Sequence, residues 1–280
     1  MPGCLYIVST PIGNLQDMSP RAAAVLGQVD FVAAEDTRVT LKLLNHLGLK
    51  KPLVSYNQHN AEARGPSVLE RLTAGESCAL CSDAGTPAIS DPGELLVAEA
   101  HRQGLPVVCV PGACAAVAAL SVSGQSTGRF VFEGFLAQNR RQRRQRLEAL
   151  QNEVRTVIFY EAPHKLPATL NDLCATFGEE RAVTLCRELT KLHEETWPTT
   201  LGQAAEHYSQ NTPKGEFVLV VAGAPLPEKV PDCTLAQAAQ EALALAKQEG
   251  LSASSAARQV ARQTGYGKSE LYKAMQDMQF

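Results

Sequence analysis

The stretch LCSDAGTPAISDPG, residues 80–93, carries the clearest chemical signal in this sequence. A short apolar strand runs into a loop of small residues, and Asp91 with Pro92 predicts the N-cap and first position of a helix. A strand, a tight loop and a helix N-terminus together make a ligand cradle at the carboxyl edge of a sheet. Gly85 lets a ligand approach the backbone, and Asp83 can accept hydrogen bonds from an amine or hydroxyl. The alternative is an ordinary strand-to-helix turn.

Two other predicted strands end in similar small, turn-forming residues, STPIGN at residues 9–14 and VPGA at residues 110–113. In a parallel sheet the three ends converge on one edge, where open α/β sheets bind ligands. None of the three loops contains Lys or Arg, which argues against a polyphosphate and for a neutral or zwitterionic ligand. The sequence has no G-x-G-x-x-G after a strand and no G-x-x-x-x-G-K-[ST], so a dinucleotide Rossmann site and a P-loop are disfavoured.

Polar residues gather at the predicted strand ends of the second half: YEAPHK at residues 160–165, RELTKLHEE at 187–195 and GEF at 215–217. One interpretation is a set of salt bridges and caps on a solvated edge. Two such clusters opposite a cradle of small residues indicate instead a site between two domains.

The elements that must position these loops follow from the pattern of the 280 residues. Strands and helices alternate over residues 1–123, which predicts an N-terminal α/β domain with a mostly parallel sheet. Residues 124–224 predict a second α/β domain with a mixed sheet. Residues 225–280 predict a Pro-rich linker, which ends at residue 232, and a helical module. No run of 18 apolar residues or basic-then-apolar leader occurs, so neither a membrane span nor a secretory signal is expected.

The eight cysteines mostly lie in apolar contexts, which favours buried free thiols in a reducing cytosol. Cys78 and Cys81 have C-x-x-C spacing, but an extended segment points their side chains to opposite faces. Because no second pair of ligands follows, we expect no metal site.

The segment NRRQRRQR, residues 139–146, holds five arginines in seven residues of a chain whose net charge is −3. This concentration predicts a footprint for nucleic-acid phosphates, and the alternative is the solvated start of a helix. The candidates are Arg140, Arg141, Arg143 and Arg144.

The C-terminal module offers a second candidate surface. A capped helix at residues 252–261, a turn containing Gly265 and a helix at residues 268–278 form a helix-turn-helix pattern, with Lys268 and Lys273 on the second helix. A plain three-helix cap is the alternative. Such a module could contact RNA or another protein.

Taken in order, these motifs resemble the ribosomal RNA small subunit methyltransferase I family, within the tetrapyrrole-methylase-like (class III) S-adenosylmethionine enzymes. The resemblance covers about residues 4–223. It rests on STPIGNL (9–15), AEDTR (34–38), residues 82–93, PG (111–112), FEGFL (132–136), YEAPH (160–164) and RELTK (187–191). The sequence departs from the family pattern at Ala113-Cys114-Ala115, Asn57-Gln58-His59-Asn60, Ala137 and Lys165, all of which keep the loop sizes.

The resemblance implies two α/β domains with S-adenosylmethionine in the cleft between them, a cytoplasmic homodimer, and 2′-O-methylation of a cytidine in the decoding region of 16S ribosomal RNA. It also implies the residues that line the cofactor. These are Pro11, Asp83, Ala84, Gly85, Thr86, Pro87, Pro111, Gly112, Ala113, Glu161 and Ala162.

Methyl transfer from a sulfonium is an in-line displacement from an activated donor, so the enzyme must mostly position and desolvate. A ribose 2′-hydroxyl is a weak nucleophile and needs a nearby base or cation. The candidates are Glu133, His59, Glu161, Glu188 and Lys191. We favour Glu188 with Lys191 as the pair on the acceptor side, with His59 as a further candidate. Phosphates could be held by Arg38, Arg187 and Lys191.

Two other functions compete with this interpretation. A methylase of the same fold could act on a tetrapyrrole, but a small substrate needs neither the arginine run nor the helical module. A non-catalytic nucleic-acid-binding protein could use the helix-turn-helix, but it would have no use for a cofactor slot.

Overall fold

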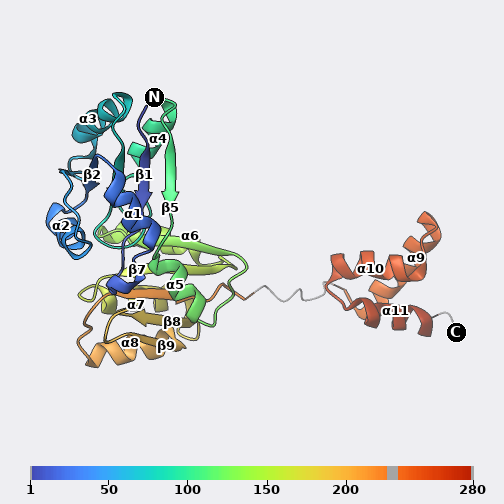
Figure 1. Cartoon of the computed structure of the whole chain (residues 1–280). Coiled ribbons are helices and arrows are strands. Elements are labelled where there is room, and N and C mark those ends of the chain that lie inside the picture. The colour runs from blue at the N-terminus through green and yellow to red at the C-terminus, as the bar shows by residue number, and fades with distance from the viewer. Residues whose placement is uncertain (1, 226–232, 279–280) are drawn as a thin grey trace. The chain divides into compact units, whose positions relative to one another are not determined.

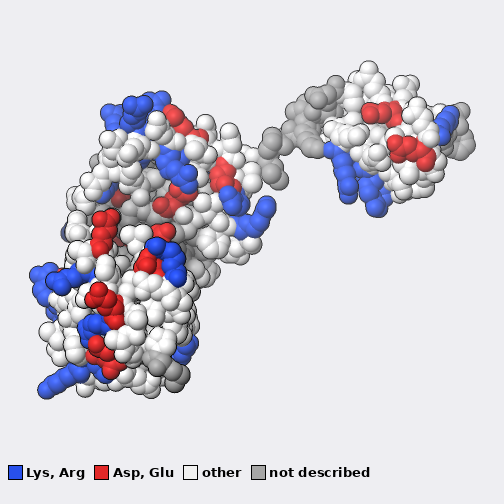
Figure 2. Space-filling view, turned by 90° about the horizontal axis from the view of Figure 1, so that it is seen from above, with Lys and Arg blue, Asp and Glu red and all other residues white. Residues whose placement is uncertain are grey.

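The computed structural model describes residues 2–225 and 233–278 of the chain. The residues cluster into two compact units, Met1–Ala224 and Pro225–Phe280 (Figure 1). Most of the expected linker and the last two residues of the chain lie outside the described residues. Acidic and basic side chains are interspersed over the face of the larger unit in Figure 2. Nucleic-acid contacts therefore have to be sought in local clusters of charge.

The first sheet contains five strands in the order β3-β2-β4-β1-β5, and all of them are parallel, which confirms the predicted, mostly parallel sheet. The strands are β1 (Leu5–Val8), β2 (Phe31–Ala34), β3 (Leu53–Ser55), β4 (Cys78–Cys81) and β5 (Val107–Val110). One face packs against α1 (Pro20–Gln28) and α2 (Thr37–His46), and the other against α3 (Ala61–Thr73) and α4 (Glu94–Arg102). Because both faces are covered, the strands are short apolar runs.

The cysteine pair on β4 illustrates how both faces are used. Cys78 packs in the core under α3 and α4, whereas Cys81 packs in the core under α1 and α2. The prediction that the two side chains point to opposite faces is confirmed, and all eight cysteines are free thiols. Burial raises the pKa of each of these two thiols to about 12, which keeps them protonated and unreactive.

The predicted start of α4 at Asp91 and Pro92 is wrong by two residues. The helix begins at Glu94, and its N-cap is Gly93 with φ +142°. In the loop before the helix, Ala88 and Ser90 adopt left-handed φ values of +67° and +64°. Asp91 does not cap the helix because its carboxyl group lies in a cavity and is hydrogen-bonded to Ser82 instead.

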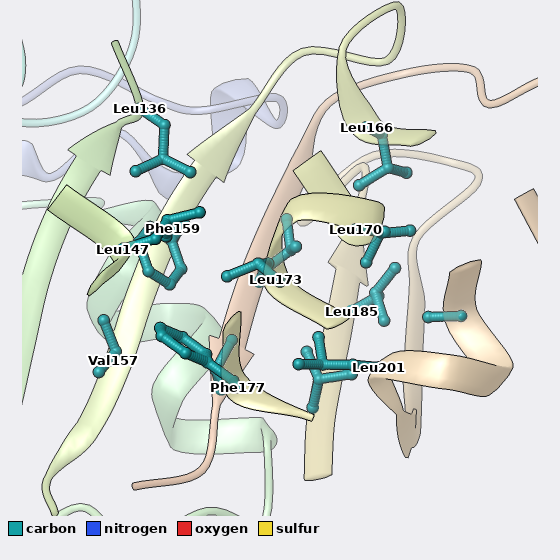
Figure 3. Packing of buried hydrophobic residues seen from close by; sticks show 14 of the residues in the cluster. Leu136, Leu147, Val157, Phe159, Leu166, Leu170, Leu173, Phe177, Leu185 and Leu201 are labelled. Atoms are coloured by element: carbon teal, nitrogen blue, oxygen red, sulfur yellow. The ribbon is translucent and has the colours of Figure 1, made fainter. Parts of the chain in front are cut away.

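The second sheet is mixed, in the order β6-β7-β10-β8-β9, with only the β6–β7 pair parallel. Its strands are β6 (Phe130–Phe135), β7 (Thr156–Glu161), β8 (Ala182–Arg187), β9 (Glu195–Thr200) and β10 (Phe217–Val221). One face carries a leucine-rich core under α6 (Arg140–Leu150), α7 (Leu166–Phe177) and α8 (Leu201–Gln210), shown in Figure 3. The opposite face packs against α5 (Ala115–Val122).

The smaller unit is the predicted helical module. It contains α9 (Leu235–Glu249), α10 (Ala253–Thr264) and α11 (Lys268–Asp277) around an alanine-rich core. Thr234 and Gln237 form a capping box on α9, and Gly250 and Gly265 end α9 and α10 in the left-handed conformation. Three residues separate α10 from α11, which fits a helix-turn-helix. No helix in the described ranges is both long and apolar enough to cross a membrane.

Candidate active site

A cavity of about 400 Å³ lies where the carboxyl ends of the first sheet meet one face of the second. Its first wall comes from the loops after β1, β2 and β4 and from the start of α5. Its second wall comes from the ends of β6 and β7, the loop after β8 and the start of β10. The volume lies in the range of small-molecule sites.

Six of the residues predicted to line the cofactor do line this cavity. They are Asp83, Ala84, Gly85, Thr86, Glu161 and Ala162. Pro11 and Pro87 are not lining residues, although their neighbours Ile12 and Thr86 are. Pro111, Gly112 and Ala113 are not lining residues either, and the next two residues, Cys114 and Ala115, take that position.

Hydrogen bonds tie the three small-residue loops together. Thr10 and Gly85 exchange backbone hydrogen bonds of 2.8 and 3.1 Å. The Thr86 hydroxyl donates to the Ala113 carbonyl oxygen at 3.0 Å, so the Ser9 hydroxyl, 2.9 Å away, is the donor to Thr86. Gly112 packs closely against Ser9. A Cβ atom at this position would lie only 2.9 Å from the Ser9 Cβ, so a larger residue would clash. The PG turn therefore supports the cradle from behind instead of lining it.

The cradle loop (residues 82–93) and the loop after β2 give the cavity an acidic wall. Glu35, Asp83 and Asp91 all line it, and no Lys or Arg does among the residues described. The Glu35 carboxylate accepts the Asp83 amide at 3.2 Å. Burial, reinforced by the charges of Glu35 and Asp83, raises the pKa of Asp91 to about 6. Burial likewise raises the pKa of Glu35. These negative charges favour a ligand that carries positive charge.

The second wall is partly aromatic. The Tyr160 hydroxyl accepts a hydrogen bond from the Ala116 amide at 3.0 Å, and burial raises the pKa of this phenol, which stays neutral. Its ring meets those of Phe132 and Phe135 edge-on, with centroids 5.0 and 5.5 Å apart. Glu161 is buried and accepts the Ala162 amide at 2.9 Å and the Thr169 hydroxyl at 2.5 Å. Both oxygens of this carboxylate hold the turn in place.

The favoured pair, Glu188 and Lys191, forms in the structure and includes a third member. Lys191 Nζ lies 2.8 Å from Glu188 Oε1 and 2.8 Å from Glu216 Oε2, and Glu216 lines the cavity. The Lys191 hydrogen bond lowers the pKa of Glu188. Burial opposes the charge of Lys191, but its two carboxylate partners outweigh it and raise its pKa. Lys191 is therefore a fixed cation and Glu188 a weak base.

The segment that holds this pair is strained. Glu188 and Thr190 adopt left-handed φ values of +52° and +67°. The stem of Lys191 lies over Gly13, where a Cβ atom would be only 2.4 Å from Lys191 Cγ. Strain of this kind persists where surrounding contacts over-determine the backbone, as they do at functional sites.

Glu188 and Lys191 are not lining residues themselves, and the predicted acceptor residues His59, Arg38 and Arg187 are not lining residues either. His59 is exposed, and its backbone amide donates to the Asn57 side chain at 3.1 Å. Arg38 forms an exposed pair with Asp36, and Arg187 pairs with Glu195 at 3.0 Å. Their roles stay predictions from the sequence.

The arginine run on α6 divides into two groups. Arg143 pairs with Asp172 of α7, Arg144 with Glu148 and Arg146 with Glu133. Arg140 and Arg141, at the start of the helix, are exposed and form no ion pair within the part of the chain that the structure describes. In the helical module Lys268 is half-buried and Lys273 exposed on α11.

The sequence interpretation missed several cavity residues. Tyr160 directly precedes the predicted Glu161, and Glu216 stands in the polar GEF segment, so adjacency to a predicted residue was a usable signal for both. Phe135 lies in the FEGFL motif, but its direction depends on an irregularity of β6 that the sequence does not reveal.

Comparison with known proteins gives consistent results. A family model described as Tetrapyrrole (Corrin/Porphyrin) Methylases matches residues 4–205. "Ribosomal RNA small subunit methyltransferase I" of Synechocystis sp. is 50% identical over 271 residues, which is 97% of this chain and 96% of that protein. The protein of the same name from Escherichia coli O157:H7 is 44% identical over 273 residues, 97% of this chain and 94% of that one.

Solved structures share the fold at low identity. Diphthine synthase has a TM-score of 0.59 at 14% identity, covering 79% of this chain and 90% of its own. Uroporphyrin-III C-methyl transferase from Thermus thermophilus, complexed with S-adenosyl homocysteine, has a TM-score of 0.56 at 17% identity, covering 78% of this chain and 97% of its own.

Proposed function

This chain belongs to the tetrapyrrole (corrin/porphyrin) methylase family and, within it, to the ribosomal RNA small subunit methyltransferase I family, and from that premise we propose that it methylates the ribose 2′-oxygen of a cytidine in the decoding region of 16S ribosomal RNA. Its cofactor is S-adenosylmethionine. The observation that carries the proposal is a cavity with an acidic wall on one side and, on the other, Glu216, which accepts a hydrogen bond from Lys191.

The chemistry of the cavity fits this cofactor. S-adenosylmethionine carries positive charge on its sulfonium and its amino group, and three carboxylates line the wall of the cradle. A polyphosphate would need the cations that are missing from the described lining. The backbone of Ala84, Gly85 and Thr86 and the Glu161–Ala162 turn would hold the cofactor from the two walls.

When bound, the cofactor supplies a methyl group already activated by the sulfonium. The chain must then place the acceptor oxygen in line and favour its loss of a proton. Lys191 would stabilise negative charge as it develops on the 2′-oxygen, since its two carboxylate partners fix the ammonium at the rim. Glu216 is the member of this group that lines the cavity, so it would receive the proton.

The RNA would be gripped outside the cavity. Arg140 and Arg141 begin α6 only five and six residues after the cavity residue Phe135, and both are exposed. Phosphate oxygens suit guanidinium groups of this kind. Lys268 and Lys273 of the helical module would add contacts to the same RNA.

The proposal includes a homodimer in the cytoplasm, where small ribosomal subunits are made. Helix α5 supports the dimer because all its residues except Ser121 are apolar, AAVAALSV, although only one side packs on the second sheet. Val117 and Val122 remain 55% and 51% exposed. An apolar helix normally has partners on all sides, and a second copy of this chain would supply the missing one.

Incubation of the purified protein with radiolabelled S-adenosylmethionine and small subunits from cells lacking this activity tests the proposal. Nuclease digestion and mass spectrometry should locate the label on a 2′-O-methylcytidine of 16S RNA. Label on another nucleotide, or none on RNA while the cofactor still binds, would contradict the assigned acceptor.

A matched pair of variants ties the reaction to the cavity. Gly85→Arg should abolish labelling, since Gly85 lines the cavity with φ +85°. Gly104→Arg also places a side chain at a positive φ, +68°, but at a site with open space around it, and should retain labelling.

A further inference from the structure

Strand β6 contains a bulge that changes the direction of one aromatic side chain. Phe132 pairs with Ile158 of β7, and the register then shifts so that Gly134 pairs with Phe159 and Phe135 with Tyr160. Glu133 is the additional residue, and Gly134 takes the positive φ of +62°. In a regular strand Phe132 and Phe135 would lie on opposite faces. The bulge returns Phe135 to the face that Phe132 and Tyr160 share.

The bulge is held from both sides. The Glu133 carboxylate, whose side chain is only 6% exposed, accepts two hydrogen bonds of 2.6 Å from the Arg146 guanidinium of α6. Gly134 lies against the cradle loop, where a Cβ atom would be 2.9 Å from Ser90 Oγ. The direction of the Phe135 ring is therefore built into the packing between β6, α6 and the cradle loop.

Phe135 lies at the mouth of the cavity. Its side chain is 56% exposed, whereas Phe217 and Val218, which line the same cavity, are 2% and 6% exposed. Tyr160 meets the Phe135 ring edge-on and so leaves a ring face uncovered. Ile89 of the cradle loop lines the same cavity and is 45% exposed. Two large apolar side chains therefore stand in solvent where a substrate must enter.

We propose that the acceptor nucleobase stacks on Phe135, so that the enzyme acts on a nucleotide that is unpaired and turned out of the RNA stack. The inference rests on the proposed function. Proteins bind extruded bases by stacking them on aromatic rings. A ribose whose base stacks at the cavity mouth would present its 2′-oxygen to the interior. Arg140 and Arg141, which follow on the same segment, are then near enough along the chain to hold the adjoining phosphates.

Variants of Phe135 with matched controls test this proposal. The assay uses the full-length protein, S-adenosylmethionine and small ribosomal subunits, and measures kcat, KM for subunits, Kd for the cofactor and the melting temperature. Phe135→Ala should raise KM for subunits by about 5- to 150-fold, the range found when a stacked aromatic is removed. Its Kd for the cofactor should stay within about 2-fold.

The ring should matter more than its apolar character. Phe135→Tyr should restore KM almost fully, whereas Phe135→Leu, which keeps apolar area without a π-face, should retain most of the loss. The control is Phe130→Ala, since Phe130 is 40% exposed on the same strand and is not a cavity residue; its KM should match that of the wild type.

Three results would overturn the proposal. A Kd for the cofactor that rises as much as KM would assign the ring to the cofactor. Wild-type KM in Phe135→Leu would reduce its role to apolar burial, and wild-type kinetics in Phe135→Ala would remove the role altogether. The wild-type enzyme separates the two possible failures. If it methylates subunits and Phe135→Ala does so equally well, only this inference fails. If the wild-type enzyme does not methylate subunits, the proposed function fails as well.

Discussion

The hydroxyl oxygen of Tyr160 accepts a hydrogen bond of 3.0 Å from the backbone amide of Ala116. Tyr160 lies one residue before the end of β7 in the second sheet, and Ala116 lies in the first turn of α5, which follows the last strand of the first sheet. This bond ties the start of α5, where the chain leaves the first wall of the cavity, to β7, which forms part of the second wall. The amide would otherwise be one of the unpaired donors of a helix N-terminus.

Replacing Tyr160 with Phe should therefore lower both stability and cofactor affinity. The variant leaves a half-buried amide without its acceptor, which costs about 1–3 kcal/mol of the free energy of unfolding. Chemical denaturation and calorimetric titration with S-adenosylmethionine would measure the two effects. Tyr208→Phe is the control, because Tyr208 belongs to α8 and packs against the core on the other face of the second sheet. Equal effects of the two substitutions would contradict the role assigned to Tyr160.

Asp91 should make stability fall as pH rises. Its pKa of about 6 lies above the ordinary value of 3.8, so the folded state binds the proton more tightly than the unfolded state does. This contribution is fully present below about pH 4 and is lost as pH rises through 6. Because Asp91 is only partly buried, solvent screens its charge and ionisation costs less than about 3 kcal/mol. Asp91→Asn should be more stable than the wild type at pH 7.5, as urea unfolding would show.

The same substitution should weaken cofactor binding, because ionised Asp91 attracts the positive charge of S-adenosylmethionine. Wild-type affinity should rise from pH 5 to pH 7.5, and Asp91→Asn should show a shallower rise. The remaining slope would come from Glu35, whose pKa is also raised by burial. Asp91→Asn binding that is as tight and as pH-dependent as wild type would remove Asp91 from the site.

Lys191→Met should slow the reaction with little change in cofactor affinity. The substitution removes the only cation that Glu188 and Glu216 share in the described residues. Loss of a preorganised electrostatic group typically lowers kcat by about 100- to 1,000-fold. Single-turnover methylation of small subunits would measure the rate. Lys214→Met, an exposed lysine two residues before Glu216, should react like wild type. A Lys191→Met variant with normal kcat would make this pair structural.

The double variant Arg140→Ala, Arg141→Ala should bind RNA more weakly and with less dependence on salt. Each phosphate contact contributes roughly one unit to the slope of log K against log salt, so the slope should fall by about two. Filter binding across a salt series would measure it. Arg143→Ala should leave the slope unchanged and lower the melting temperature instead, because Arg143 is only 18% exposed and ties α6 to Asp172 of α7.

The parts of the site that the sequence predicted best are those that depend on local residue type. Small residues after β1 and β4 do converge, since Thr10 pairs with Gly85, and the Glu188–Lys191 spacing of three residues does bring the two side chains together. Both results follow from chain-local geometry combined with a parallel sheet. Helix capping alone placed the start of α4 wrongly, because a buried site near Ser82 competes for the Asp91 carboxylate.

Features that depend on pairing between distant segments could not be predicted. The bulge at Glu133 appears only when the register of β6 on β7 is known, so nothing in FEGFL shows that Phe135 faces the cavity. The arginine run likewise looked uniform along the sequence. Its division into tethered and unpaired side chains depends on Asp172 and Glu133, which belong to other elements.

The order of the strands has a consequence for synthesis of the chain. Every strand of the first sheet lies between residues 5 and 110, and every strand of the second between 130 and 221. Neither sheet borrows a strand from the other. During translation, the first half can complete its hydrogen bonding before the second has left the ribosomal tunnel, since domains fold as units from the N-terminus. We therefore expect the catalytic cavity to form last in the larger unit, and a nascent chain to gain methyl-transfer activity only once β10 is in place.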